Sequence, residues 1–406
     1  MSAQTSLFSL DQLREAADLV HARMAPTPQY AWPLLAERLG AEVWVKHENH
    51  TPCGAFKVRG GSVLLDHMAR TGKPPRIVTA TRGNHGQSIP FAAAPHGIPV
   101  EVFVPHGNAS EKNAAMKAWG AELIVHGHDF EESRLAAVAR AEETGAALIP
   151  PFDPHLVLGV ATYALEFFAA VPDLDAVYVP VGMGSGACGV IAARDLLGLK
   201  TEVVPVVSAH ADAYALSFAA GHVVTTDSAP TFVDGVACRA PWAQPLEILR
   251  AGAERIVRVT DDEVAEAMRV YHADTHNMAE AAGAVPLAAL MQERGRERGY
   301  LMHAKHARGA RAGLEALGLT AFAQHPSHAL TSATMPQGVF APAGLKHMRQ
   351  AYGVNMAGGQ EHLKPKLVRL GHLGFVRERD VIAGVVALGR ALEDGGDFCI
   401  GERLQH

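Results

Sequence analysis

Lys57 is the residue of this sequence whose type and surroundings best suit covalent chemistry on a small molecule. It lies in Gly54-Ala55-Phe56-Lys57-Val58-Arg59-Gly60, after a strand signal at Glu42 to Lys46 and the turn residues Asn49 and Pro52. Such a turn holds a primary amine within reach of a small molecule, and lysine is the side chain that forms Schiff bases with carbonyl compounds. The pattern makes Lys57 a candidate covalent catalyst.

A second stretch is typical of an anion-binding turn. The apolar strand signal Val177 to Val181 breaks into Gly182-Met183-Gly184-Ser185-Gly186, and a helix signal follows from Ala187 to Leu197. Glycines let the backbone turn tightly and direct N–H groups at an anion, while the helix N-terminus adds partial positive charge. The G-x-G-x-G spacing is not the dinucleotide fingerprint. We predict a phosphate site; the alternative is a glycine-rich connection packed against a neighbour.

A third stretch, Thr81-Arg82-Gly83-Asn84-His85-Gly86-Gln87, also lies between a strand signal and a helix signal. Its backbone N–H groups could bind a carboxylate, and the Asn84 amide can donate a hydrogen bond to a ring oxygen. The alternative is a polar loop with a helix cap.

The elements that must position these stretches alternate between strand and helix. This alternation predicts an α/β fold with a parallel sheet and helices on both faces. The pairs of strand and helix signals are 77–81 and 87–94, 100–104 and 111–119, 123–126 and 130–144, and 177–181 and 187–197, followed by a strand at 202–208 and a helix at 262–272. Ser9 with Gln12 and Thr260 with Glu263 are predicted capping boxes.

The pattern changes after Ala289, and we place a domain boundary at about residues 293 to 303. Beyond it the sequence predicts a helix at 294–313, a strand at Ala329 to Met335, a Gly-Gly turn at 358 and 359, and a helix at 380–392.

Composition excludes several classes of function. The 406 residues are 48% apolar and 19% charged with a formal net charge of −6, which predicts two or three globular units and no basic surface for nucleic acid or anionic membrane. No apolar run could span a bilayer and residues 1–12 lack a signal-peptide pattern, so we expect a cytoplasmic protein. The four cysteines have no C-x-x-C spacing and the paired histidines lack a completing carboxylate, so we expect reduced thiols and no metal.

Residues 1 to about 293 resemble the threonine and serine dehydratases of the fold-type-II pyridoxal-phosphate enzymes. The three stretches carry this resemblance together with Asp234-Gly235 and Glu280-Ala281-Ala282-Gly283-Ala284. It implies a tryptophan synthase β-like domain over 1–293 with two parallel-sheet subdomains, the smaller at about 51–148. It also implies pyridoxal 5'-phosphate as cofactor, a small amino-acid substrate, and a homodimer or higher homo-oligomer.

The resemblance implies a role for each site residue. Lys57 would bind the cofactor covalently and remove the substrate Cα proton, and Asn84 would contact the ring hydroxyl. The cofactor site would comprise Phe56, Lys57, Asn84, Gly182, Met183, Gly184, Ser185, Gly186 and Glu280, and the substrate would contact Thr81, Arg82, Gly83 and His85. The implied reaction removes water and ammonia from L-threonine or L-serine to give a 2-oxo acid; threo-3-hydroxyaspartate is the alternative substrate.

Two departures from the family bear on activity. Arg82 replaces a serine that acts as a base in racemases of this group, and arginine stays protonated, so racemase activity is disfavoured. Arg82 either attracts a substrate with an extra anionic group or forms a structural ion pair. The family also continues with a strand and a Ser-Gly-Gly-Asn turn whose serine binds the pyridine nitrogen. The chain lacks this turn, although the strand signal at Ala329 to Met335 could replace the strand.

The C-terminal segment resembles a different family. From about Met302 to Ala391 it is similar to the small domain of the class V, fold-type-I alanine-glyoxylate and serine-pyruvate aminotransferases, in which the arginine matching Arg369 binds the substrate carboxylate. This implies an α/β small domain over 294–406. A natural fusion with a binding or oligomerisation module, an impaired product of a gene deletion, and an assembly artefact all fit this arrangement.

Overall fold

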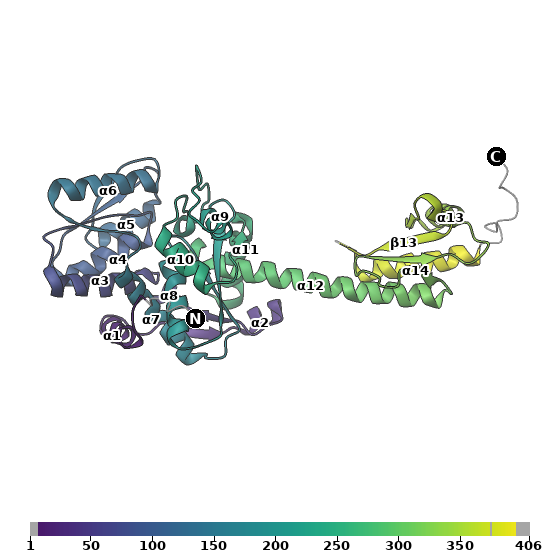
Figure 1. Ribbon diagram of the computed structural model, residues 1–406, viewed down its shortest axis with the longest axis horizontal. Coiled ribbons are helices and arrows are strands. Elements are labelled where there is room, and N and C mark those ends of the chain that lie inside the picture. The colour runs from purple at the N-terminus through teal and green to yellow at the C-terminus, as the bar shows by residue number, and fades with distance from the viewer. Residues whose placement is uncertain (1–6, 374–375, 395–406) are drawn as a thin grey trace. The chain divides into compact units, whose positions relative to one another are not determined.

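The computed structural model describes residues 7–373 and 376–394, and it shows two compact units (Figure 1). The first spans residues 1–293 and the second residues 294–406. The helix α12 (Ala281–Ala316) begins in the first unit and ends in the second. Each unit has its own hydrophobic core.

The first sheet of the first unit is four-stranded and parallel, in the order β5-β4-β3-β6. Its strands are β3 (Ile77–Ala80), β4 (Val100–Val104), β5 (Glu122–Val125) and β6 (Ala147–Ile149). One face packs on α3 (Lys57–Gly72), α4 (Asn84–Ala93) and α5 (Ser110–Ala118), and the other packs on α6 (Phe130–Thr144). Helices on both faces explain why every residue of β3 and β4 is buried.

The second sheet is three-stranded and parallel, in the order β7-β8-β9. Its strands are β7 (Ala176–Pro180), β8 (Glu202–Ser208) and β9 (Val257–Val259). In β8, Val203 and Val207 face one core cluster while Val204 and Val206 face the other, as strand geometry requires. The first cluster joins α1 (Leu10–His21), α7 (Pro154–Ala170), α8 (Ser185–Leu196), α9 (Ala213–Ala220) and α10 (Ala243–Gly252); the second joins α2 (Pro33–Leu39), α11 (Asp261–Thr275) and the start of α12.

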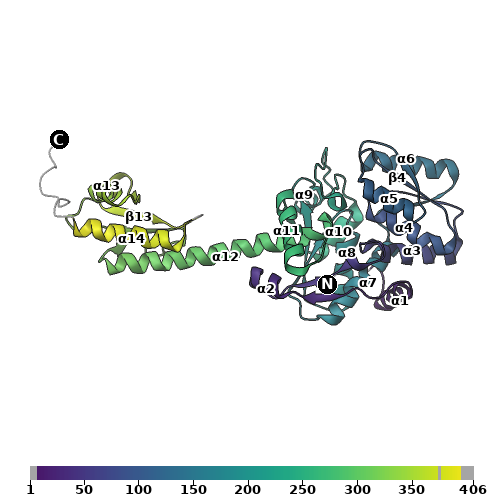
Figure 2. The same cartoon turned by 180° about the vertical axis from the view of Figure 1, so that it is seen from behind.

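These two parallel sheets with helices on both faces confirm the predicted α/β fold, and Figure 2 shows them from behind. The predicted capping boxes at Ser9 and Thr260 are both present. The predicted strand at Glu42 to Lys46 forms only β2 (Trp44–Lys46), which pairs antiparallel with β1 (Gln29–Ala31) outside the parallel sheets. Short 3-10 helices are η1 (Glu48–His50), η2 (Ala94–His96) and η3 (Asp234–Val236).

The second unit is an antiparallel sheet with helices, in the strand order β10-β11-β13-β12. Its elements are β10 (Thr320–Ala321), β11 (Leu330–Thr334), α13 (Ala341–Tyr352), β12 (Ala357–Gly358), η4 (Glu361–Leu363), β13 (Leu367–Gly371) and α14 (Glu378–Glu393). The strand predicted at Ala329 to Met335 is β11, which pairs with β10 and β13. It therefore does not extend a parallel sheet of the first unit, and the suggestion that it replaces a missing strand there is wrong.

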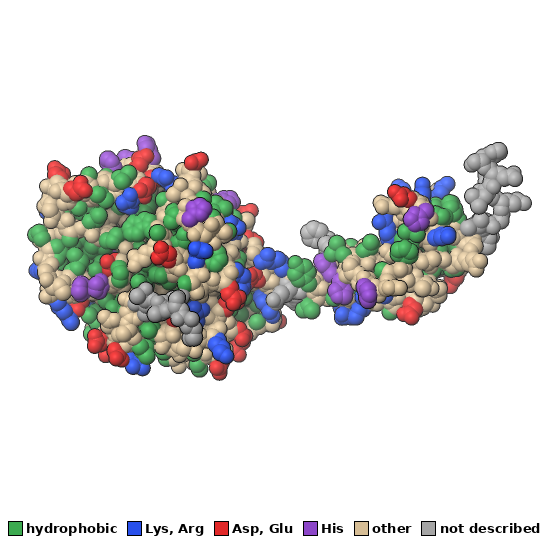
Figure 3. Space-filling model, viewed as in Figure 1, with side chains coloured by type: hydrophobic (Ala, Val, Ile, Leu, Met, Phe, Trp, Pro, Cys, Tyr) green, Lys and Arg blue, Asp and Glu red, His purple; other side chains and the backbone are tan. Residues whose placement is uncertain are grey.

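Cys53, Cys188 and Cys238 are free thiols in the buried interior, and Cys399 lies outside the described residues. No helix within residues 7–373 and 376–394 is long and apolar enough to cross a bilayer. On the visible face of the first unit, acidic and basic side chains are interspersed (Figure 3).

Candidate active site

Lys57 is the first residue of α3, and its amine meets the first residue of α8. Lys57 Nζ donates a hydrogen bond of 2.5 Å to Ser185 Oγ and lies 5.2 Å from the centre of the Phe56 ring. Burial lowers the pKa of the Lys57 amine from 10.5 to about 8. About a tenth of this amine is therefore unprotonated at pH 7, far more than for an ordinary lysine, and the unprotonated form is the one that a nucleophile or base requires.

Three of the predicted site residues each begin a helix: Lys57 in α3, Asn84 in α4 and Ser185 in α8. The residues that precede these helices, Phe56, Gly83 and Gly184, make no capping hydrogen bond with a side chain. The first N–H groups of a helix have no partner within the helix and carry partial positive charge. The helix starts at Asn84 and Ser185 therefore suit anionic groups of a ligand.

Close packing and backbone conformation require glycine at three positions around the junction of β7 and α8. A Cβ at Gly182 would lie 2.3 Å from the Gly235 carbonyl oxygen, and one at Gly186 would lie 3.2 Å from the Phe56 ring. Gly184 has a φ of 95°, in the left-handed region that favours glycine. The glycine-rich turn is thus packed closely against its neighbours, as the alternative to a phosphate site predicts. A phosphate at the uncapped start of α8 is compatible with it and stays a prediction.

The loop from Thr81 to His85 follows β3 and is held by internal hydrogen bonds. The Gly83 N–H donates to Thr81 Oγ1 at 2.9 Å, and His85 Nε2 lies 3.1 Å from Thr79 Oγ1. Burial, together with the charge of Lys57, lowers the pKa of His85 to about 3, so this ring is neutral at physiological pH. Asn84 Nδ2 donates to the carboxylate of Glu280, which directly precedes α12.

An ionic cluster lies beside this loop. Arg82 Nη2 is 3.3 Å from one carboxylate oxygen of Asp234, and Lys112 Nζ is 3.5 Å from the other. Lys112 Nζ is also 3.5 Å from Glu280, and its side chain would contact a Cβ placed at Gly83 at 2.7 Å. The ion pair predicted as one reading of Arg82 is therefore present. Sequence reasoning missed Lys112, because a lysine in the first turn of an ordinary helix carries no signal.

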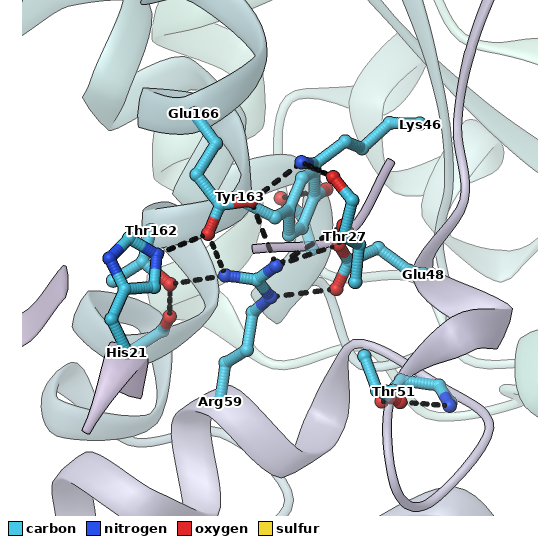
Figure 4. A network of polar contacts seen from close by, with 12 residues as sticks. His21, Thr27, Lys46, Glu48, Thr51, Arg59, Thr162, Tyr163 and Glu166 are labelled. Carbon is cyan, nitrogen blue, oxygen red and sulfur yellow. Dashed lines mark hydrogen bonds and ion pairs between the residues drawn. The ribbon is translucent and has the colours of Figure 1, made fainter. Parts of the chain in front are cut away.

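A buried polar network lies behind Lys57 and is shown in Figure 4. The Arg59 side chain is fully buried and donates to both oxygens of Glu48 and both oxygens of Glu166. Lys46 Nζ, 2.5 Å away, and His21 also contact Glu166. Burial alone would raise the pKa of Glu166, but the hydrogen bonds and charges of Arg59, with Lys46 and His21, lower it to about 2.

This network anchors the face of α3 opposite Lys57. Residues two positions apart point in roughly opposite directions on an α-helix, so Lys57 faces Ser185 while Arg59 faces η1 and α7. Gly159 of α7 permits this packing, because a Cβ there would lie 2.4 Å from the Arg59 carbonyl oxygen. Arg59 is thus a residue that positions Lys57 through the helix.

Arg369, the predicted substrate contact of the C-terminal segment, lies on β13 of the second unit. Its Nε donates to the Gly358 carbonyl oxygen at 2.7 Å. Its neighbours Val368 and Leu370 belong to the core cluster, so Arg369 points to the opposite face of the sheet.

Comparisons with known proteins agree with this geometry. A model of the family described as "Pyridoxal-phosphate dependent enzyme" matches residues 21–302. An L-threonine ammonia-lyase of Geobacter sulfurreducens is 33% identical over 283 residues, which are 70% of this chain and 70% of that protein. An L-threonine ammonia-lyase of Thermotoga maritima is 30% identical over 288 residues, covering 71% of this chain and 72% of the relative.

Solved structures give the same result. A threonine deaminase of T.th. superimposes with a TM-score of 0.66 at 31% identity, over 71% of this chain and 94% of the other. The diaminopropionate ammonia lyase of Escherichia coli superimposes with a TM-score of 0.65 at 26% identity, over 73% and 85%. The family match ends at residue 302, so the aminotransferase-like character of the C-terminal segment stays a prediction. The chain belongs to the pyridoxal-phosphate-dependent enzymes and has their fold type II.

Proposed function

We propose that this protein is a pyridoxal-phosphate-dependent ammonia-lyase that removes water and ammonia from a 3-hydroxy amino acid, L-threonine or L-serine, to give a 2-oxo acid. The observation that carries this proposal is the buried Lys57 amine, hydrogen-bonded to Ser185 at the start of α8 beside the glycine turn. The names of the relatives, L-threonine ammonia-lyase among them, support the same reaction.

Pyridoxal 5'-phosphate is the cofactor of the family, and the residues of the first unit fit it. The phosphate would be held by the turn Gly182 to Gly186, where Gly184 adopts a left-handed conformation and α8 begins without a side-chain cap. Lys57 would bind the aldehyde, Phe56 would pack beside the ring, and Asn84 would contact the ring hydroxyl. Glu280 would lie near the ring, since it already contacts Asn84.

When bound, pyridoxal phosphate withdraws electrons from the substrate Cα, which makes its proton removable. The chain's own residues do the rest. The N–H groups of the loop from Thr81 to His85 would bind the substrate carboxylate. The low pKa of His85 keeps its ring neutral, so the ring contributes no charge to this contact. Lys57 would take the Cα proton through its unprotonated amine, held by Ser185 Oγ. Loss of the 3-hydroxyl group as water and hydrolysis of the resulting enamine release the 2-oxo acid and ammonia.

Formation of 2-oxo acid from L-serine, L-threonine and threo-3-hydroxyaspartate tests the proposal. Lys57→Ala should abolish activity, whereas Lys200→Ala, at an exposed lysine, should leave it unchanged. A reconstituted wild-type protein that produces no oxo acid from any of the three would refute the proposal. Arg82→Ala should change the preference between threonine and hydroxyaspartate by less than threefold, because Arg82 is paired with Asp234. A larger change would favour hydroxyaspartate as the substrate.

We also propose that residues 294–406 form a small domain of the class V aminotransferase type. This domain either binds a small molecule or joins copies of the chain, and the protein is a cytoplasmic homo-oligomer. The separate core and the antiparallel sheet of the second unit support this. Calorimetry of L-alanine and glyoxylate with the full chain, compared with Arg369→Ala, tests the binding role. Light scattering of the full chain gives its oligomeric state.

A further inference from the structure

The second unit contains a groove of about 390 Å³ between α12 and α14. This volume lies in the range of small-molecule sites, about 300 to 1,000 Å³. The wall from α14 is apolar and includes Val381, Ile382 and Val386. Ile382 is 56% exposed and Val386 is 47% exposed, so both present apolar surface that a ligand could cover. Figure 3 shows histidine and hydrophobic side chains side by side on the visible face of this unit.

Glycines of α12 make the opposite wall. A Cβ at Gly309 would meet nothing within 4 Å, whereas a Cβ at Gly313, one turn later, would lie 2.8 Å from Val385. The two helices are therefore in close contact at Gly313, and the missing side chain at Gly309 leaves the groove open.

His306 gives the groove a polar group that lacks a partner. The residue is 6% exposed, and among the described residues its buried Nδ1 has no hydrogen-bond partner. A buried ring nitrogen without a partner is unfavourable. Because this atom is enclosed, the His306 ring must turn towards the groove before an oxygen atom of a ligand can satisfy it.

The rim of the groove is basic. Arg308 and Lys305 both line it from α12, and Lys305 Nζ is paired with Glu378 at 3.0 Å. Because one carboxylate faces two permanent cations, the rim keeps a net positive charge that favours an anion.

We propose that this groove binds a small aliphatic monocarboxylic acid, because its apolar chain matches the apolar wall and its single anionic group matches the basic rim. The chain lies against Ile382 and Val386 in the space above Gly309. The carboxylate accepts hydrogen bonds from His306 Nδ1 and Arg308. This site lies within the second unit and is independent of the ammonia-lyase reaction.

Octanoate binding to the full-length holoenzyme, measured by calorimetry, tests the site. Gly309→Leu places a side chain in the groove at a position where its Cβ meets nothing within 4 Å, and it replaces a poor helix former by a good one, so the variant should fold. Gly295→Leu is the matched control, because it makes the same change in α12 where a Cβ also meets nothing within 4 Å and where the groove has no lining residue. Arg308→Gln and the uncharged ligand octan-1-ol test the role of the charge.

We expect wild type and Gly295→Leu to bind octanoate alike, and Gly309→Leu to bind it at least about tenfold more weakly. Arg308→Gln should weaken octanoate but not octan-1-ol. Absence of octanoate binding to wild type, or equal affinity in Gly309→Leu, would overturn the proposal. So would a change of oligomeric state in Gly309→Leu without any octanoate binding, since the groove would then be a contact between copies of the chain.

Discussion

Replacing Lys57 by methionine should stabilise the cofactor-free protein at neutral pH. The folded chain holds the Lys57 amine at a pKa of about 8, against 10.5 for an ordinary lysine, and burial is the main cause. The folded state therefore disfavours the charged amine, and this difference is equivalent to about 3 kcal/mol at pH 7. Methionine has a similar length and no charge, so the variant avoids that destabilisation.

The variant also loses the hydrogen bond from Lys57 to Ser185, which contributes about 1 kcal/mol. The expected net gain at pH 7 is thus about 2 kcal/mol. The destabilisation of the wild type is complete below pH 8 and disappears as the pH rises towards 10.5, where the amine is neutral in both states. The advantage of the variant should therefore fall to about zero by pH 10.

Urea unfolding followed by tryptophan fluorescence measures this difference in the first unit alone, because all four tryptophans lie there: Trp32, Trp44, Trp119 and Trp242. Lys117→Met, at an exposed lysine of α5, is the control and should change the free energy of unfolding by less than about 0.5 kcal/mol. The reasoning is refuted if Lys57→Met is no more stable than wild type at pH 7, or if its advantage is the same at pH 7 and pH 10.

Other predictions concern the network behind Lys57 and the glycine turn. Arg59→Met should lower the free energy of unfolding by about 3 to 5 kcal/mol in the same assay, because it leaves buried carboxylates unpaired. Arg269→Met, which removes an exposed ion pair, is the control and should lower the free energy of unfolding by less than about 0.5 kcal/mol. With a pKa of about 2, Glu166 contributes stability above about pH 4.5 that is lost as the pH falls towards 2. Glu166→Gln should accordingly weaken the loss of stability between pH 6 and 3, and an unchanged slope would contradict this. Gly182→Ala should weaken pyridoxal-phosphate binding at least about tenfold in an absorbance titration, since its Cβ would meet a carbonyl oxygen, while Gly72→Ala, which has open space, should bind normally.

The strand and helix alternation of the first unit could be predicted from the sequence because its signals are local. The helix Phe130–Thr144 was predicted with its observed bounds, and the capping boxes at Ser9 and Thr260 depend only on neighbours three residues apart. The helix Pro154–Ala170 was not predicted. It is packed between α3 and α8 and is apolar on most sides, so its sequence lacks the polar face that marks an amphipathic helix.

The same helix explains why the ionic network behind Lys57 could not be predicted. Glu166 lies in it, and its partner Arg59 is 107 positions earlier, so no sequence spacing connects them. Lys112 likewise meets Asp234 only because the two parallel-sheet subdomains pack together. In contrast, Asn84 and Ser185 could be selected from the sequence as candidate ligand-binding residues. Each lies beside a glycine where strand, turn and helix signals coincide, and each begins a helix in the structure.

The burial of Lys57 has a consequence for the timing of its reactivity during synthesis. The amine acquires its low pKa only when it packs against Ser185, which leaves the ribosome later, and the site also needs Glu280. At about 5 to 20 residues per second, the ribosome needs roughly 6 to 26 s to pass from Lys57 to Ser185. Throughout that interval the lysine is an ordinary, protonated amine that reacts slowly with cellular aldehydes. The chain thus gains a reactive amine at the same moment as the enclosure that restricts what can reach it.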